Sequence, residues 1–191
     1  MTATRRPEAR GPGSGVSASY EDRAHAALDA LGIPLSVVRS RGLPLCAEAR
    51  TLVVAEVDAR GREQRLSPAA ASAWKRMKTA AAEAGVGLHL VSAFRSLDRQ
   101  CEIVREKLAS GQSLDEILAV SAPPGYSEHH TGRAVDIGST PDATLEEAFE
   151  GSDAYAWLGA NASRYGFFLS YPRENRYGYR YEPWHWVHLK A

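Results

Sequence analysis

The sequence predicts a single α+β domain. Segments with the β-branched content of strands are mixed with amphipathic, capped segments typical of helices, without the regular alternation of a doubly wound sheet. The 191 residues are enough for one domain with a sizeable core and short for two. Hydrophobic residues make up 44% and charged residues 24% of the chain, as in an ordinary globular protein.

The first quarter of the chain predicts a tail, a helix and two short strands. Residues 1–19 are rich in Gly, Pro, Ser, Ala and Arg, which is the composition of a disordered tail. The folded domain is therefore expected over residues 20–191. It begins with a short helix over residues 20–32. Apolar, β-branched residues predict strands at 35–38 and 51–57.

A turn around Gly61 separates these strands from a long helix. Ser67 is a good N-cap, and Pro68 suits the first helical position because the N–H that it lacks would be unpaired there. Gly85 suits a left-handed C-cap. Residues 87–94 then predict a buried strand.

Caps also mark the next two helices. Ser96 opens a helix with an apolar stripe that includes Cys101, and Ser113 forms a capping box with Glu116 at the start of a shorter helix. The rest of the chain predicts a loop at 122–132, a strand at 133–138, a helix at 153–165, a strand at 167–171, a turn at 173–178 and a final aromatic-rich strand at 179–189.

Charge excludes two classes of partner. Lys and Arg number 23, as do Asp and Glu, so the formal net charge is zero. A nucleic-acid-binding protein usually has a basic excess, and so does a protein that binds membrane surfaces through a polybasic segment. We therefore expect neither partner.

No part of the sequence predicts export or membrane insertion. There is no run of 18 apolar residues for a transmembrane helix, and no apolar stretch follows Arg5 and Arg6 as it would in a secretory signal. The expected location is the cytoplasm. The cell envelope becomes the alternative if the start codon is misassigned or a leader has been removed.

The two cysteines do not predict a disulfide framework or a thiolate zinc site. Cys46 and Cys101 are too few for either. A thiol or redox enzyme that uses Cys101 is disfavoured, because this residue lies on the apolar stripe of a helix.

Four residues in the last third of the chain predict a catalytic metal site. His129, Asp136 and His185 provide two imidazoles and one carboxylate, a common ligand set for catalytic zinc that leaves the fourth position to water. Glu182 is the candidate general base, since a carboxylate that does not bind the metal can take a proton from water. Glu182 and His185 face opposite sides of a regular strand, so a bulge or turn at Pro183–Trp184 must bring them together.

Each of these residues also has an ordinary structural interpretation. A lone histidine is more often a surface or core residue than a ligand, and Glu182 alone would be a solvated strand charge. His130 and His188 are interpreted as residues beside the site or at the surface. Asp136 lies between apolar residues, where an unpaired carboxylate is costly to bury, so a metal or an arginine partner is expected.

Arg95 ends the buried strand and precedes a helix cap. It is either a surface cation or a fixed guanidinium that pairs with a substrate carboxylate or stabilises an oxyanion. Trp184 and Trp186, which flank His185, are expected in the core, although one of them could form a wall of the pocket.

Several motifs together resemble the VanY-type D-alanyl-D-alanine carboxypeptidases, a family of zinc peptidases that act on peptidoglycan stem peptides. The resemblance covers residues 40–189. It rests on S-A-F-R-S at 92–96 with Gln100, S-E-H-H-T-G-R-A-V-D at 127–136, A-W-L-G-A-N-A-S-R-Y-G-F at 156–167 and E-P-W-H at 182–185.

The resemblance implies a role for each matching residue. His129, Asp136 and His185 correspond to the ligands of one zinc ion, and Glu182 corresponds to the catalytic base. Arg95 corresponds to the substrate-side arginine, while Ser127 and Gln100 correspond to residues that line the substrate site. The implied fold is a small α+β domain with a central antiparallel sheet flanked by helices, as in the hedgehog N-terminal domain.

The sequence departs from this family at two places. His130 stands where the family often has Gln, and Trp186, Val187 and His188 stand where it often has an aromatic residue, Arg and Tyr. If the missing Arg binds a carboxylate in the family, another group must do so here, or the specificity differs.

The residues and the resemblance together predict a zinc carboxypeptidase, with a monomer favoured, that hydrolyses the C-terminal D-alanyl-D-alanine bond of peptidoglycan-type stem peptides. A D,D-dipeptidase, an L,D-carboxypeptidase or an endopeptidase of the same superfamily is the near alternative. A more distant one is a non-catalytic, zinc-containing module that binds a peptide or glycan. Glu182 argues against that module, since a structural zinc site needs no free carboxylate beside it.

Overall fold

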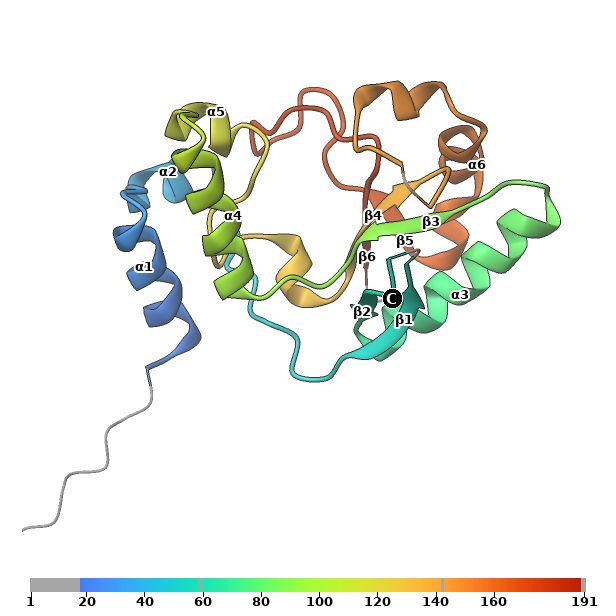
Figure 1. The fold of residues 1–191 in the computed structure, drawn as a ribbon, viewed down its shortest axis with the longest axis horizontal. Coiled ribbons are helices and arrows are strands. Elements are labelled where there is room, and N and C mark those ends of the chain that lie inside the picture. Colours follow the sequence, from blue (N-terminus) through green and yellow to red (C-terminus); the bar gives the residue numbers. More distant parts are fainter. Residues whose placement is uncertain (1–17, 59, 142, 190–191) are drawn as a thin grey trace, which may run out of the picture.

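The computed structural model describes residues 18–58, 60–141 and 143–189, and it has the α+β fold predicted from the sequence. Its centre is a four-stranded antiparallel sheet in the order β3-β4-β6-β5 (Figure 1). The strands of this sheet are β3 (His89–Ser92), β4 (Ala134–Gly138), β6 (His185–His188) and β5 (Phe167–Leu169). A separate antiparallel pair consists of β1 (Val53–Val57) and β2 (Glu63–Leu66).

One core cluster lies between the central sheet and the helices α3 (Pro68–Glu83) and α6 (Asp153–Asn161). Ser67 and Pro68 occupy the N-cap and first helical position of α3, and Gly85 follows the helix with a φ of 77°, as the sequence predicted. Trp74 and Met77 of α3 are almost fully buried against the sheet. The spacing of apolar residues therefore correctly identified the face of α3 that packs on the core.

A second core cluster joins the helices α1 (Tyr20–Ala30), α2 (Leu35–Ser40), α4 (Leu97–Ala109) and α5 (Leu114–Leu118). Figure 1 shows these four helices grouped at one end of the molecule, away from α3 and α6. Cys101 is buried among them, and burial raises the pKa of its thiol. Both findings agree with an inert core cysteine.

The strand predicted at residues 35–38 is wrong, because this segment forms the helix α2. Its Val and Leu content favoured a strand by propensity alone. In the structure Pro34 occupies the N-cap position, and Val38 is buried against the second core cluster. Tertiary packing therefore outweighed a weak local preference.

Three further elements also differ from the sequence predictions. β2 was not predicted, and the strand predicted at 179–189 is regular only in β6. Pro183 has no N–H to offer a sheet, and a turn forms there in which the His185 N–H donates to the Glu182 carbonyl over 3.1 Å. The helix predicted at 153–165 continues from α6 into the 3₁₀ helix η3 (Ala162–Tyr165).

The tail predicted at residues 1–19 lies outside the described residues, except for its last two positions. Ser19 is the N-cap of α1 and forms a capping box with Asp22, so the tail prediction extended too far. None of the helices in the described residues combines the length and the apolar content that crossing a bilayer requires.

Two further 3₁₀ helices complete the described fold, η1 (Glu128–Thr131) and η2 (Glu147–Gly151). η1 ends at Gly132, whose φ is 63°. A Cβ at this position would lie 2.9 Å from Leu52 Cδ2 and 3.0 Å from the Ser67 backbone nitrogen. Only glycine fits there without displacing its neighbours, and the chain can then turn from η1 into β4.

Candidate metal centre and substrate cavity

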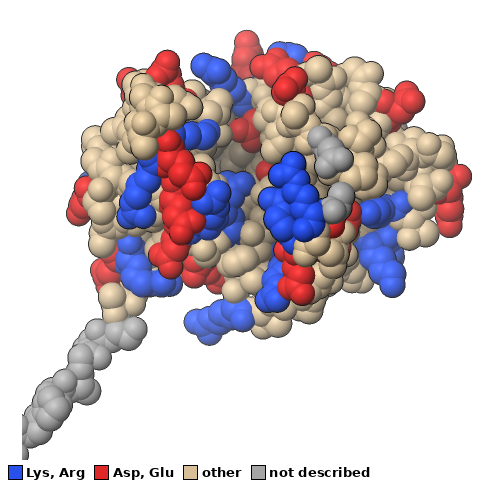
Figure 2. Space-filling model, in the orientation of Figure 1, with Lys and Arg blue, Asp and Glu red and all other residues tan. Residues whose placement is uncertain are grey.

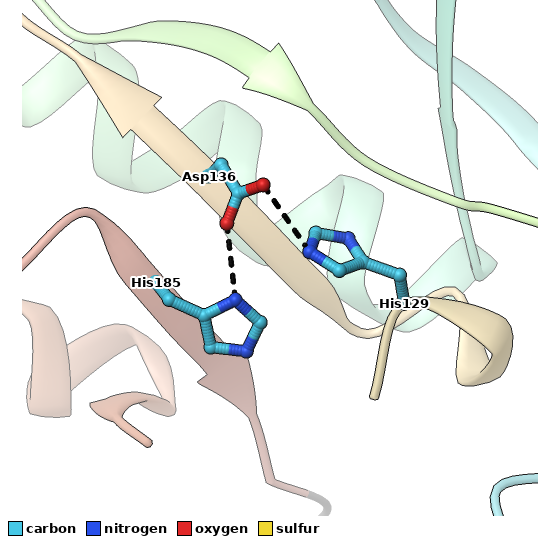
Figure 3. A group of neighbouring side chains, drawn as sticks. All are labelled: His129, Asp136 and His185. Atoms are coloured by element: carbon cyan, nitrogen blue, oxygen red, sulfur yellow. Dashed lines mark hydrogen bonds and ion pairs between the residues drawn. The ribbon is translucent and has the colours of Figure 1, made fainter. Parts of the chain in front are cut away.

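His129, Asp136 and His185 come together over β4 and β6, the two inner strands of the central sheet (Figure 3). Asp136 lies in the middle of β4, and sheet register places it opposite His185, the first residue of β6. His129 lies in η1, just before β4. One potential ligand atom from each residue lies within 4.8 Å of the other two, and all three side chains are buried.

The ligand atoms are spaced closely enough to share one metal ion. Asp136 Oδ2 lies 3.2 Å from His129 Nε2, and Asp136 Oδ1 lies 3.0 Å from His185 Nδ1. Ligands about 2 Å from one tetrahedral zinc ion lie about 3–4 Å apart. The donor set of two imidazoles and one carboxylate also suits catalytic zinc, so these residues fit the ion that the sequence predicted.

Hydrogen bonds fix which nitrogen of each imidazole faces the cluster. His129 Nδ1 lies 2.6 Å from the Ala93 carbonyl, which can only accept, so Nδ1 carries the proton and Nε2 faces Asp136. His185 has the opposite arrangement, with Nδ1 facing Asp136 and Nε2 lying 2.9 Å from Glu128 Oε2. Hydrogen bonds of this kind orient the histidine ligands of metal sites.

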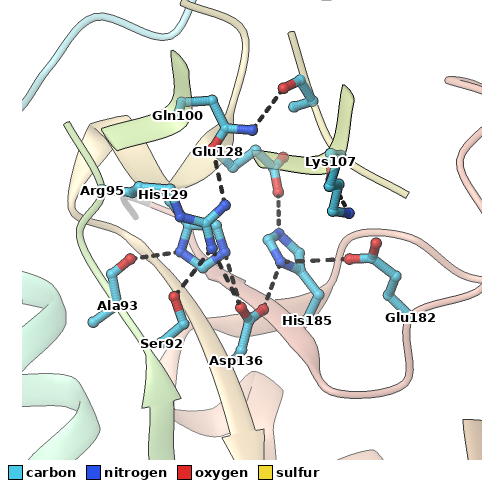
Figure 4. A network of polar contacts seen from close by, with 12 residues as sticks. Ser92, Ala93, Arg95, Gln100, Lys107, Glu128, His129, Asp136, Glu182 and His185 are labelled. Atoms are coloured by element: carbon cyan, nitrogen blue, oxygen red, sulfur yellow. Dashed lines mark hydrogen bonds and ion pairs between the residues drawn. The ribbon is translucent and has the colours of Figure 1, made fainter. Parts of the chain in front are cut away.

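Sequence reasoning missed Glu128. This residue immediately precedes His129, but the carboxylate reaches the ring of His185 in β6 (Figure 4). The only sequence signal was its position within the matched motif. Its contact depends on how η1 packs beside β6, which residue spacing does not specify.

The pKa values of the cluster follow from buried charges. Burial alone would raise the pKa of Asp136, but the adjacent His129 and His185 lower it well below its usual range. Burial opposes protonation of His185, yet hydrogen bonds to Asp136 and Glu128 raise its pKa to about 10. Without a cation, the two carboxylates therefore favour a proton on His185, and a metal ion would replace that positive charge.

Glu182 lies beside the cluster, with Oε2 3.9 Å from His185 Nδ1. The turn at Pro183–Trp184 turns both side chains toward one site, as the sequence required. Burial raises the pKa of Glu182 to about 7, although the nearby His185 opposes that rise. A carboxyl group with a pKa near neutrality can both accept and return a proton.

Neighbouring side chains hold Arg95, which lies three residues after the end of β3. Its Nη1 donates to Gln100 Oε1 over 2.9 Å, and its Nη2 donates to Ser92 Oγ over 3.1 Å. Nη2 also lies 3.9 Å from Asp136 Oδ2, so Asp136 has the arginine partner that its burial called for. The Gln100 amide donates to the Ala122 carbonyl over 2.7 Å. Gln100 is fully buried, and the structure places it behind Arg95.

A cavity of about 390 Å³ opens over the cluster, between the two core clusters of the fold. Figure 2 shows that this face is hollowed and that acidic and basic side chains are interspersed over it. Tyr171 stacks on the His185 ring, with ring centroids 4.5 Å apart. Among the described residues, the lining includes Arg95, Lys107, Ser127, His129, Asp136, Tyr171, Tyr179, Glu182, Trp184 and His185. Trp184 thus forms part of the wall, whereas Trp186 is in the core.

His130 is fully buried next to His129, so of its two interpretations the position at the surface is wrong, and the residue lies beside the site. Its Nδ1 lies 2.6 Å from the Arg95 carbonyl, and its Nε2 accepts the Gly125 N–H over 3.1 Å. Burial lowers the pKa of His130 to about 4, which keeps the ring neutral and able to make both bonds. His130 therefore joins the backbone after β3 to the loop before η1. His188 is half-buried and packs against Phe167.

Replacing His130 with Ala is expected to lower the free energy of unfolding by about 3 kcal/mol, because the change leaves two buried backbone groups unpaired and opens a cavity. Urea denaturation of the metal-free protein measures the change. The half-buried His89 provides a matched control, since His89→Ala removes no comparable pair of backbone bonds. A loss below about 1 kcal/mol for His130→Ala would contradict the structural role.

Comparison with known protein families matches residues 63–190 to VanY, described as D-alanyl-D-alanine carboxypeptidase. The chain belongs to the VanY family. A putative carboxypeptidase of Bacillus subtilis, YodJ, is 40% identical over 119 residues, which are 61% of this chain and 43% of YodJ. A D-alanyl-D-alanine carboxypeptidase of Enterococcus faecium is 33% identical over 63% of this chain and 36% of that protein. The chain thus spans about two-fifths of the length of these two curated relatives.

Solved structures of related peptidases share the fold of this VanY-family chain. The LD-carboxypeptidase LdcB superposes with a TM-score of 0.66 and 35% identity, over 76% of this chain and 71% of LdcB. VanYB bound to D-Ala-D-Ala gives a TM-score of 0.59 and 27% identity, over 76% of this chain and 86% of VanYB. A VanY variant bound to Zn(II) gives 0.57 and 26%, with the same two coverages.

Replacing Glu128 with Ala is expected to weaken zinc binding by about 10–100-fold, because His185 loses the carboxylate that holds its Nε2–H. Competition with a chromogenic chelator measures the affinity. Glu83, an exposed carboxylate near the end of α3, provides the control Glu83→Ala. Equal zinc affinities for the two variants would show that Glu128 does not help to hold the ligand.

Proposed function

We propose that this VanY-family chain is a zinc-dependent carboxypeptidase that releases the C-terminal D-alanine of peptidoglycan-type stem peptides. The observation that carries the proposal is the buried His129, Asp136 and His185 cluster, with the Glu182 carboxylate beside it at the base of a cavity. The VanYB relative that binds D-Ala-D-Ala supports this choice of substrate.

His129 Nε2, an Asp136 oxygen and His185 Nδ1 are the atoms that would hold zinc. When bound, the ion would polarise the scissile carbonyl and lower the pKa of a water molecule toward neutrality. Buried Asp136 contributes negative charge, and the carbonyl of Ala93 and the carboxylate of Glu128 hold the two imidazoles in place.

Glu182 is the proposed general base and acid. It takes the proton of the attacking water and then delivers it to the nitrogen of the leaving amino acid. A pKa of about 7, raised by burial, suits both transfers near neutral pH. The position of Glu182 next to His185, rather than within the ligand cluster, leaves its carboxylate available for this task.

Arg95 is proposed to stabilise the negative charge that develops on the scissile carbonyl oxygen. Its guanidinium is fixed by Gln100 and Ser92 and lies next to Asp136, so it needs little reorganisation during the reaction. In this arrangement Gln100 acts through Arg95. Ser127, which lines the cavity, is proposed to contact the substrate directly.

Cleavage of a related bond is the alternative within the same superfamily. The relatives include an LD-carboxypeptidase and a protein described as both a D-Ala-D-Ala dipeptidase and carboxypeptidase. The bond that is cut therefore has to be determined with defined substrates.

The test is incubation of the zinc-loaded protein with synthetic stem peptides that end in D-Ala-D-Ala or in a single D-Ala, followed by mass spectrometry of the products. We expect one D-alanine to be released from the D-Ala-D-Ala peptide, and no release after chelation of zinc. Cleavage of free D-Ala-D-Ala, supplied in a separate incubation, without release from the stem peptide would instead support a dipeptidase. No release with or without zinc would overturn the proposal in favour of a binding module.

A further inference from the structure

Lys107 is a cation of the cavity that the proposed mechanism does not use. It lies in α4, and its half-buried side chain lines the same cavity as Arg95 and Glu182. In the view of Figure 4, Lys107 lies on the Glu182 side of the His185 ring, while Arg95 lies on the other side. The two cations therefore approach the site from different directions.

The Lys107 ammonium can donate more hydrogen bonds than it makes to the described residues. Of its three hydrogens, one is donated to Ser121 Oγ over 2.8 Å. Within the described parts of the chain, no carboxylate forms an ion pair with Lys107, whereas Arg99 of the same helix pairs with both Glu102 and Glu106. Burial and the neighbouring Arg95 lower the pKa of Lys107, and Glu182 opposes them. A further anion near Nζ would stabilise the charged form of Lys107 against burial and the repulsion from Arg95.

The remaining charges of the cavity favour an anionic ligand group. Among its described lining residues, the carboxylates are Asp136 and Glu182, which the proposed mechanism already uses. No carboxylate of the lining is then free to pair with the amino group of a dipeptide. Arg95 is held beside the candidate ligands by its contacts with Ser92 and Asp136, which leaves Lys107 as the cation available away from the reacting carbonyl.

The geometry points to Lys107, supported by Ser121, as the group that binds the α-carboxylate of the substrate's C-terminal residue. This inference rests on the proposed function and specifies it, since it gives the site a recognition element for a free C-terminus. The ammonium would pair with the carboxylate of the leaving residue, next to the base that returns a proton to its nitrogen. Recognition of a free C-terminus favours an exopeptidase over an endopeptidase. Against a dipeptidase stands the absence, among the described lining residues, of a free carboxylate for the substrate's amino group.

The test compares two ligands that cannot be cleaved, because CH₂ replaces the scissile nitrogen of an acyl-D-alanyl-D-alanine. One ligand ends in a free carboxylate and the other in a carboxamide. Calorimetry measures the binding of each to the zinc-loaded wild type and to Lys107→Met, Lys107→Arg and Lys75→Met, where Lys75 is an exposed lysine of α3. Release of D-alanine from the cleavable peptide is measured in parallel.

We expect Lys107→Met to weaken binding of the carboxylate ligand about 10–100-fold, because a charge-assisted hydrogen bond is lost. Binding of the carboxamide ligand should be unchanged. Lys107→Arg should restore most of the carboxylate preference, and Lys75→Met should match the wild type. The KM for the cleavable acid should rise more than kcat falls.

An unchanged preference for the carboxylate in Lys107→Met would overturn the inference, as would equal weakening of both ligands, which indicates a packing role. Wild-type protein that binds neither ligand would overturn both this inference and the proposed function. Lys107-dependent carboxylate binding without any cleavage would overturn the proposed function and support this inference.

Discussion

Replacing Glu182 with Gln is expected to slow D-alanine release by about 10²–10⁴-fold while zinc remains bound. The amide keeps the shape of the side chain but cannot take a proton from water. His129, Asp136 and His185 remain in place, since Glu182 lies beside their cluster. Steady-state kinetics and metal analysis on the same preparation measure the two effects separately.

Glu83→Gln is the matched control, because this exposed carboxylate of α3 lies outside the cavity lining. It should leave both turnover and zinc content unchanged. Turnover by Glu182→Gln within about threefold of the wild type would remove the general-base role. Loss of zinc from Glu182→Gln would show that this carboxylate is a ligand.

Replacing Asp136 with Asn is expected to weaken zinc binding by more than about 100-fold, a larger effect than loss of a residue that only orients a ligand. Asp136 contacts both imidazoles, at 3.2 Å from His129 and 3.0 Å from His185, and it supplies the negative charge nearest to the proposed ion. Activity should fall with zinc occupancy and recover in part at high zinc concentration. Chelator competition measures the affinity.

Asp29→Asn, on the exposed side of α1, serves as the control for the same chemical change. Circular dichroism shows whether each variant is folded before zinc is added. If folded Asp136→Asn bound zinc as tightly as the wild type, the ion would have to occupy a different site.

The sequence identified the candidate centre well because its residues belong to short motifs with local constraints. Asp136 lies between Val135 and Ile137, which are both fully buried, so its carboxylate needs a metal or a cationic partner to offset the cost of burial. The need for a turn at Pro183–Trp184 followed from strand periodicity and the chemistry of proline, and the structure has that turn.

Residue spacing does not specify contacts between elements that are distant in the sequence. The predictions for residues that make such contacts were wrong or missing. Glu128 reaches His185 across 57 positions of sequence. Lys107 enters the cavity because the end of α4 packs near the loop that carries Ser121. His130 is buried by the backbone after β3, a segment 35 residues away from it.

The fold could be predicted as far as its elements had strong local signals. The caps of α3, α4 and α5 marked those helices. Residues 35–38 have only a weak local preference for a strand. Packing of Val38 decided the outcome there, which is a tertiary effect.

One zinc ion is expected to bind between His129 Nε2, the Asp136 carboxylate and His185 Nδ1. Anomalous diffraction at the zinc edge, from crystals of the zinc-loaded protein, tests it most directly. We expect one strong peak per chain, about 2 Å from an atom of each of these residues. A peak elsewhere, or no peak at this cluster in fully loaded protein, would contradict it.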